Sequence, residues 1–225
     1  MVVSGQGRTC PLRADLAQVK ICGLTRPEHV AAAVGAGAAF VGFVFFPKSP
    51  RYLSVEAAAA LAIDVPPGVA RVGLFVDPDD ALLDRVLTQV PLDILQLHGA
   101  ETPERIAGIR VRAGLPVMKA VGISDAKDID ALWDYGLAAD MILVDAKPPK
   151  DSVLPGGNGL AFDWRLLVGR KWLKPWMLAG GLNPDNVAAA IRLTGARIVD
   201  VSSGVETTPG IKDPALISTF IRAAE

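Results

Sequence analysis

The sequence predicts an α/β fold built as a single (βα)8 TIM barrel. Three observations lead to this fold class. Eight short apolar runs follow one another along the 225 residues, a longer stretch with helical character follows each run, and the spacing is even. Strict alternation of strands and helices indicates a parallel sheet, and eight pairs are the number that closes it into a barrel. A doubly wound open sheet is the structural alternative, which the count and the spacing disfavour.

The predicted strands are nearly continuous apolar runs rather than alternating ones, as expected for strands buried on both faces. They are Val19–Cys22, Phe40–Phe45, Val72–Val76, Ile94–Leu97, Val117–Val121, Met141–Val144, Trp176–Ala179 and Ile198–Val201.

The predicted helices lie between these strands. Thr25, Asn183 and Asp213 are candidate N-caps, because short polar side chains satisfy the free N–H groups of a first helical turn. The helical ranges are Pro27–Val34, Ser54–Ile63, Pro78–Gln89, Thr102–Arg112, Asp125–Tyr135, Asp163–Val168, Pro184–Thr194 and Pro214–Ala223.

Two regions lie outside this rhythm. We expect residues 1–18 to be an N-terminal extension that can be disordered, and residues 19–225 to form the barrel catalytic domain. Residues 146–162 form a long loop with several glycines and prolines. Long loops in compact domains are often functional lids, so we expect this loop to cover a site.

The composition limits the function classes. A formal charge of −1 gives no indication of a nucleic-acid or membrane surface as a partner. Only Cys10 and Cys22 are present, which is too few for a disulfide scaffold of this size. The first 18 residues contain no apolar signal region, and no apolar run is long enough to span a bilayer. We therefore expect a cytoplasmic protein, monomeric or homodimeric.

The active site of such a barrel lies where its strands end. Cys22 ends the first strand, ahead of a glycine and an expected helix start, a setting that can lower a thiol pKa and favour a thiolate base or nucleophile. Asp145 ends the sixth strand after apolar residues, which favours a partly desolvated carboxyl able to act as a general acid. The structural alternatives are an inert buried cysteine and a loop-capping aspartate.

Glycines and small hydroxyl residues follow the last two strands. Gly180 and Gly181 come after the seventh strand, and Ser203 and Gly204 after the eighth. At these positions backbone N–H groups can approach an anion closely, and barrels of this type commonly bind phosphate there. The sequence therefore predicts a small phosphorylated substrate.

Other charged residues have weaker indications. Arg51, on a proline-stiffened loop, can hold a carboxylate with two hydrogen bonds. His98, after the fourth strand, can carry a proton or make a polar contact, whereas His29 is expected on a solvated helix face. Lys119, within the fifth strand, is expected as a polar plug inside the barrel rather than as a Schiff-base lysine.

Metal and cofactor sites have little support in the sequence. The two histidines are far apart, and no His/Cys/Asp cluster has ligand spacing. The glycine-rich segment 156–159 fits neither a Walker A loop nor a dinucleotide-binding turn. We expect neither a metal nor a cofactor.

Together these motifs resemble the phosphoribosylanthranilate isomerase family of tryptophan biosynthesis. The matching segments follow one another in the family's order, from about residue 19 to the end of the chain. The matching segments are KICGLT at 20–25, VGFVFFPKSPRY at 41–52, GLFVD at 73–77, LQLHG at 95–99, LVD at 143–145, GGNGLAFDW at 156–164, LAGGLNP at 178–184, VDVSSGVE at 199–206 and PGIKD at 209–213.

The resemblance implies an Amadori rearrangement of N-(5-phosphoribosyl)anthranilate to the 1-deoxyribulose 5-phosphate derivative. It implies Cys22 as general base and Asp145 as general acid. It also implies Arg51 as the contact for the anthranilate carboxylate, and His98 and Asp200 as substrate contacts. The implied phosphate cradle is Gly180, Gly181, Ser203 and Gly204.

Two departures from the family pattern are visible. Asn158 stands where threonine or serine is expected, which puts the hydrogen bonding of the glycine-rich loop in question, and residues 1–18 have no counterpart.

The nearest rival function is a dual-substrate isomerase that also serves histidine biosynthesis. The resemblance argues against it, because that class has an aspartate at the end of the first strand, where this chain has Cys22. Indole-glycerol-phosphate synthase, another barrel enzyme with a phosphate site, would need catalytic lysines, and no lysines of this sequence can be assigned to those roles. A non-catalytic phosphate-binding barrel would be expected to lose Cys22 or Asp145.

Overall fold

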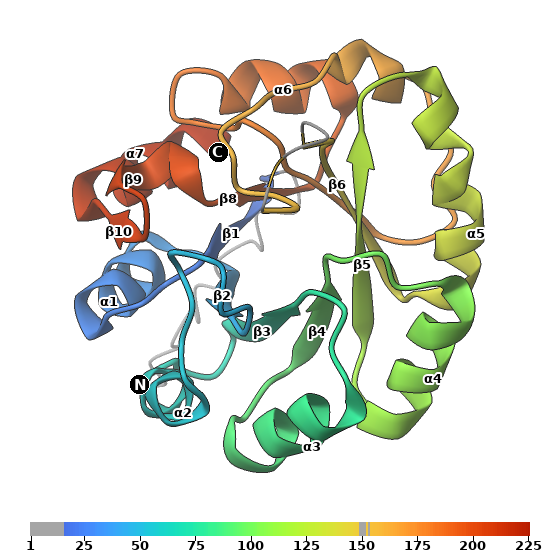
Figure 1. The fold of residues 1–225 in the computed structure, drawn as a ribbon. Coiled ribbons are helices and arrows are strands. Elements are labelled where there is room, and N and C mark those ends of the chain that lie inside the picture. The colour runs from blue at the N-terminus through green and yellow to red at the C-terminus, as the bar shows by residue number, and fades with distance from the viewer. Residues whose placement is uncertain (1–15, 149–151, 153) are drawn as a thin grey trace, which may run out of the picture.

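Eight parallel strands close into a barrel in the computed structural model, which describes residues 16–148, 152 and 154–225. Each strand pairs with the next along the chain, and β8 returns to β1. The helices surround the barrel in chain order (Figure 1). The predicted fold class is confirmed, and the open-sheet alternative is wrong.

The barrel strands begin and end within two residues of the predicted runs, and a short antiparallel pair follows them. The strands are β1 Gln18–Cys22, β2 Phe40–Val44, β3 Ala70–Phe75, β4 Ile94–Leu97, β5 Val117–Ile123, β6 Met141–Ala146, β7 Trp176–Leu178, β8 Ile198–Val201, β9 Glu206–Thr208 and β10 Ile211–Lys212.

The helical elements include three short 3₁₀ turns, labelled η. They are α1 Pro27–Ala36, α2 Val55–Ile63, α3 Asp80–Gln89, α4 Pro103–Ala113, η1 Ala126–Ile129, α5 Ala131–Ala138, η2 Trp164–Leu167, α6 Val187–Thr194, η3 Ser203–Val205 and α7 Pro214–Ala224.

The prediction of a helix at Asp163–Val168, after the sixth strand, is wrong. In the described chain this segment contains only the single 3₁₀ turn η2. The Asp125–Tyr135 helix is divided into η1 and α5. The helix expected from Pro184 begins only at Val187.

The predicted caps have mixed outcomes. Asp213 caps α7 by accepting hydrogen bonds from the backbone N–H groups of Ala215 and Leu216. Thr25 does not cap α1, because its hydroxyl donates to the Gly210 carbonyl at 3.0 Å. Asn183 accepts from the backbone N–H groups of Asp185 and Asn186, so it forms the turn before α6 rather than its N-cap.

Side chains alternate between the barrel interior and the helix layer along each strand. The small interior cluster consists of Val72, Ile94, Met118, Ala120, Leu143, Met177 and Ala179. A larger cluster fills the space between strands and helices. Since Met118 and Ala120 point inward, Lys119 between them points outward. The polar-plug prediction for Lys119 is therefore wrong: its Nζ lies 2.7 Å from the Glu101 carboxylate and 5.4 Å from the Tyr135 ring centre.

His29 was expected on a solvated face, and this expectation is also wrong. Its side chain is buried on α1, and desolvation by burial lowers its pKa. Its Nδ1 atom has no hydrogen-bond partner in the described chain.

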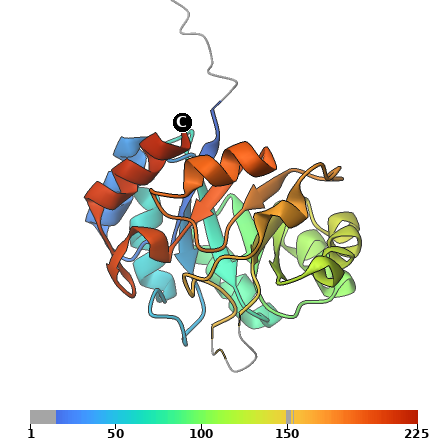
Figure 2. The ribbon, with the colours of Figure 1, turned by 90° about the horizontal axis from the view of Figure 1, so that it is seen from above.

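The two faces of the barrel are distinct in Figure 2. The C-terminus lies at the face where β1 begins, and the described part of the loop after β6 lies at the opposite face. Residues 1–15, including Cys10, are outside the described residues, so most of the predicted extension is untested; Gln18 already belongs to β1. None of the helices among the described residues could span a lipid bilayer.

Candidate active site

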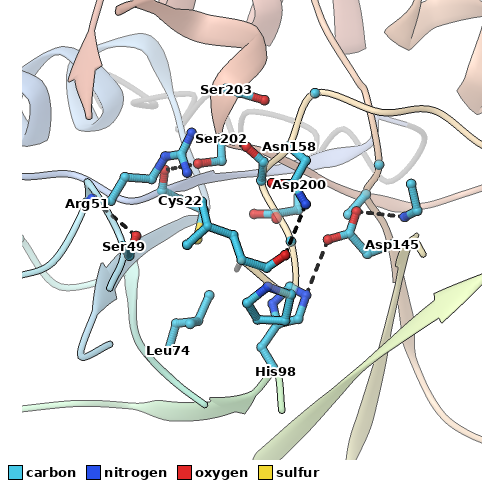
Figure 3. Close-up of a pocket in the computed structure, with 18 of the residues that line it drawn as sticks. Cys22, Ser49, Arg51, Leu74, His98, Asp145, Asn158, Asp200, Ser202 and Ser203 are labelled. Atoms are coloured by element: carbon cyan, nitrogen blue, oxygen red, sulfur yellow. Dashed lines mark hydrogen bonds and ion pairs between the residues drawn. The ribbon is translucent and has the colours of Figure 1, made fainter. Parts of the chain in front are cut away.

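A cavity of roughly 780 Å³, counting its solvent-open mouth, lies at the C-terminal ends of the barrel strands. The predicted residues Cys22, Arg51, His98, Asp145 and Asp200 all line it. Figure 3 shows these side chains arranged around one space, coming from different strands and loops. The structure therefore brings together residues that lie up to 178 positions apart in the sequence, Cys22 and Asp200 being the most distant.

Cys22 faces the barrel interior at the end of β1 and is almost completely buried. Burial raises the pKa of its thiol, and the positive charge of Lys20 only partly offsets that effect. The predicted lowering of this pKa is therefore wrong, because desolvation disfavours the thiolate more than the position at the strand end favours it. Gly42 on the neighbouring strand leaves room for the thiol, since a Cβ there would lie 3.0 Å from Sγ.

Lys20 is a site residue that sequence reasoning missed. It lies one layer below Cys22, fully buried, and its Nζ is 2.8 Å from Oδ1 of Asp200. Burial alone would lower the lysine pKa, but the attraction of Asp200 outweighs it and the pKa is raised. The signal in the sequence was a charged residue inside a strand otherwise buried on both faces. Lys20 thus remains an ammonium ion beneath the thiol.

Asp145 ends β6, and each of its carboxylate oxygens has a partner. Oδ1 accepts a hydrogen bond of 2.8 Å from the backbone N–H of Ala146. Oδ2 lies 3.3 Å from Nε2 of His98, which projects from the end of β4. These contacts are drawn in Figure 3. Asp145 is therefore held at a fixed place in the mouth, separated from the Cys22 strand by β7 and β8.

Arg51 is buried and already holds a carboxylate, that of Glu206 on β9. Its Nε and Nη2 atoms lie 2.7 and 2.8 Å from the two Glu206 oxygens, and Nη2 also reaches the Gly157 carbonyl at 3.3 Å. Sequence reasoning missed Glu206, which has no local pattern and lies 155 positions from Arg51. In this arrangement only the Nη1 edge of Arg51 makes no hydrogen bond to a described residue.

Lys212 on β10 extends this network towards Cys22. Its Nζ donates to Glu206 at 2.7 Å and to the Ser202 carbonyl at 2.9 Å. The Ser202 hydroxyl donates in turn to the Cys22 carbonyl at 3.2 Å. Burial lowers the pKa of Lys212 to about 8, although Glu206 opposes the shift. Burial would raise the pKa of Glu206, but Arg51 and Lys212 together lower it.

The glycines after β7 adopt backbone angles that side chains rarely permit. Gly180 and Gly181 have φ of +82° and +66°, and a Cβ on either would lie 2.7 Å from a backbone nitrogen of a neighbouring segment. Both line the cavity, and so does Ser203. Gly204 does not line it: a Cβ there would lie 2.0 Å from the Leu182 carbonyl oxygen. Gly204 thus allows two loops of the site to pack together.

Replacing Gly204 with alanine should destabilise the protein by roughly 1–3 kcal/mol, because the new methyl group must displace backbone. Thermal unfolding of Gly204→Ala against the parent measures this effect. Gly108→Ala on α4 is the matched control: apart from its chain neighbours and the backbone of its own helix, no atom lies within 4 Å of the added Cβ, and alanine is the better helix former. An unchanged melting temperature for Gly204→Ala would contradict the close approach.

The glycine-rich loop packs directly on the site. A Cβ at Gly156 would lie 2.6 Å from both Oδ2 of Asp145 and Nε2 of His98. Asn158, the departure from the family pattern, donates from Nδ2 to the Leu154 carbonyl at 3.1 Å. The asparagine therefore makes a hydrogen bond within its own loop. Residues 149–151 and 153, also part of the predicted lid, lie outside the described residues.

Within the described ranges, no three His, Cys, Asp or Glu side chains come together in a way that could hold a metal ion.

Comparison with known proteins gives a consistent result. A family model described as N-(5'-phosphoribosyl)anthranilate (PRA) isomerase matches residues 19–223. The N-(5'-phosphoribosyl)anthranilate isomerase of Paracoccus denitrificans is 70% identical over 206 residues, covering 92% of this chain and 96% of that protein. The phosphoribosyl anthranilate isomerase structure from Thermotoga maritima has a TM-score of 0.84 and 41% identity, covering 93% of this chain and 98% of that one.

A further similar structure contains a ligand. It is a phosphoribosyl anthranilate isomerase in complex with reduced 1-(o-carboxyphenylamino)-1-deoxyribulose 5-phosphate, with a TM-score of 0.79 and 39% identity, covering 93% of this chain and 98% of that one.

Proposed function

The chain belongs to the N-(5'-phosphoribosyl)anthranilate isomerase family, enzymes of tryptophan biosynthesis, and from that premise we propose that Asp145 and Cys22 are its acid–base pair. The observation that supports this proposal is their placement in one cavity at the strand ends, with Asp145 anchored by Ala146 and His98 and Cys22 above Lys20. The substrate is N-(5'-phosphoribosyl)anthranilate, rearranged to 1-(2-carboxyphenylamino)-1-deoxyribulose 5-phosphate.

The proposed reaction begins with two proton transfers, one from Asp145 and one to Cys22. Asp145 donates a proton to the furanose ring oxygen, the C1′–O bond breaks, and the anthranilate nitrogen supplies the electron pair that forms an iminium ion. Cys22, as the thiolate, removes the proton at C2′, and the C–H electrons form an enolamine. The enolamine then becomes the ketone by moving a proton from the C2′ hydroxyl to C1′. The Cys22 thiol finally loses its proton to solvent and Asp145 takes one up, which restores the starting acid–base pair. The two roles suit groups held in different environments.

The raised pKa of Cys22 is compatible with the base role. A thiolate of higher pKa is a stronger base once formed, although less of it is present at neutral pH. The buried ammonium of Lys20 favours the thiolate and limits that loss. Lys20 is thereby proposed to support the base without touching the substrate.

The phosphate of the substrate is proposed to bind at Gly180, Gly181 and Ser203, which line the cavity beside the turn that precedes helix α6. Gly204 supports this cradle by its close approach to Leu182 rather than as a lining residue. Asp200 and His98, which also line the cavity, remain proposed substrate contacts. The predicted cytoplasmic location and monomeric or homodimeric state stay predictions.

Arg51 is proposed to contact the anthranilate carboxylate. Because Glu206 occupies Nε and Nη2, the contact in this arrangement runs through Nη1, and a bidentate clamp would require Arg51 to release Glu206. Arg51→Ala should raise KM at least about tenfold with a smaller effect on kcat, since a hydrogen bond to a charged group contributes about 1.5–3 kcal/mol.

Steady-state kinetics measure this change, with Lys48→Ala as the matched control. Lys48 is an exposed cation on the same loop and does not line the cavity. An unchanged KM in Arg51→Ala would remove Arg51 from substrate binding.

The activity itself is tested by following phosphoribosylanthranilate consumption by fluorescence, with a chelator present. Conversion at an enzymatic rate, with the ketone product identified by mass and NMR, would support the proposal. A folded protein that leaves the substrate intact would sink it and favour the non-catalytic alternative. Turnover of the histidine-pathway substrate as well would favour the dual-substrate alternative.

A further inference from the structure

We propose that Gln96 is a positioning residue that sets the tautomer of His98, and through His98 holds the proton of Asp145 in place. A line of contacts runs from the barrel interior to the mouth. Nε2 of Gln96 lies 3.2 Å from Nδ1 of His98, and Nε2 of His98 lies 3.3 Å from Oδ2 of Asp145. The His98–Asp145 end of this line is visible in Figure 3. The inference rests on the proposed role of Asp145.

Gln96 has few other ways to use its amide group. It is fully buried on β4, and the residues level with it on β3 and β5 are Leu74 and Met118, which offer no strong hydrogen-bonding group. Its Oε1 atom has no hydrogen-bond partner within the described chain. A buried amide oxygen without a partner is unusual in a folded protein. His98 is therefore the contact that orients this amide.

The orientation of the Gln96 amide determines which ring nitrogen of His98 carries the hydrogen. When Gln96 donates to Nδ1, a neutral ring carries its hydrogen on Nε2, where it points at Asp145 and stabilises the carboxylate. When the amide is rotated by half a turn, Oε1 accepts from Nδ1–H. Nε2 can then accept a hydrogen bond from protonated Asp145.

An acid catalyst passes through both of these states in each turnover. Asp145 must hold its proton before ring opening and lose it during ring opening, then regain it. An amide can support both tautomers of His98, because it offers a donor at one end and an acceptor at the other. A carboxylate at position 96 would support only one tautomer, and an apolar side chain neither.

The first test is a double-mutant cycle with Gln96→Met and His98→Asn. Gln96→Met should lower kcat about tenfold or more with little change in KM, the size of effect seen when groups that orient a functional side chain are removed. In the His98→Asn background, Gln96→Met should cause no further loss, because the two residues act through one another. If the losses in kcat of the two single variants multiply in the double variant, or if Gln96→Met changes only KM, the proposal is overturned and Gln96 is a direct substrate contact.

The second test does not require turnover. The chain contains two histidines, His29 and His98, so ¹⁵N-histidine NMR can follow the His98 ring in the substrate-free protein. The wild type should show one dominant tautomer, and Gln96→Met a mixture. Met118→Leu, an apolar exchange level with Gln96 on β5, is the control and should leave the His98 signals unchanged. Unchanged His98 signals in Gln96→Met would refute the inference.

The two tests fail independently. If the protein lacks isomerase activity, the kinetic cycle cannot be run, but the tautomer measurement still decides whether Gln96 controls His98. If the protein is active and the tautomer is unaffected by Gln96→Met, the inference fails while the proposed function stands.

Discussion

Asp145→Asn should lower kcat by about 10²–10⁴-fold, the range typical for losing a general acid. Asparagine keeps the size of the side chain, and its amide can still contact Ala146 and His98, but it has no proton to give to the ring oxygen. Because the change removes proton transfer rather than a binding contact, the dissociation constant for substrate should change little. Stopped-flow fluorescence under single-turnover conditions measures the chemical rate, and titration of the variant measures binding.

The matched control is Asp134→Asn, an exposed aspartate on α5 that does not line the cavity. It should retain the wild-type rate. An Asp145→Asn variant with near wild-type turnover would remove this residue from the acid role.

Cys22→Ser should produce a loss of similar size, because a hydroxyl ionises far less readily than a thiol and cannot supply the base. The cavity changes little, since sulfur and oxygen side chains have the same connectivity. Substrate binding should persist, so the variant should form the complex and fail to convert it. Accumulation of unreacted complex in a single-turnover experiment would support the base role, whereas rapid product formation would contradict it.

The pH dependence of the wild type follows from the same thiol. Burial raises the pKa of Cys22, and the base works only when it is deprotonated. The ultraviolet absorbance of the thiolate, measured as the difference between the wild type and Cys22→Ser, should therefore rise with pH only above the range in which an ordinary thiol titrates, near 8.5. A plateau reached below pH 7 would show that the thiolate forms far more readily than its buried position implies.

The sequence predicted the features that depend on local pattern. Continuous apolar runs indicated the strands, and the rule that barrel sites lie at strand ends placed Cys22, His98 and Asp145 at one mouth. The side-chain direction within a strand is harder to predict. Lys119 was assigned to the wrong face because a single-residue shift reverses the side on which a strand residue lies.

Long-range pairing and burial could not be predicted. The Arg51–Glu206 ion pair joins residues 155 positions apart, and no spacing rule connects them. The pKa of Cys22 depends on the balance between burial and the charge of Lys20, which only the folded structure determines. The 3₁₀ turn η2 replaces a predicted helix, because the backbone is already extended at Val168 and Gly169 follows with a φ of +71°.

Single-turnover kinetics with substrate deuterated at C2′ would test the division of roles between Asp145 and Cys22 most directly. In Cys22→Ser, removal of the C2′ proton should limit the rate, so deuterium should slow the reaction clearly. In Asp145→Asn, ring opening should limit the rate, and deuterium should have little effect. A clear isotope effect in Asp145→Asn together with none in Cys22→Ser would contradict the assignment of acid and base.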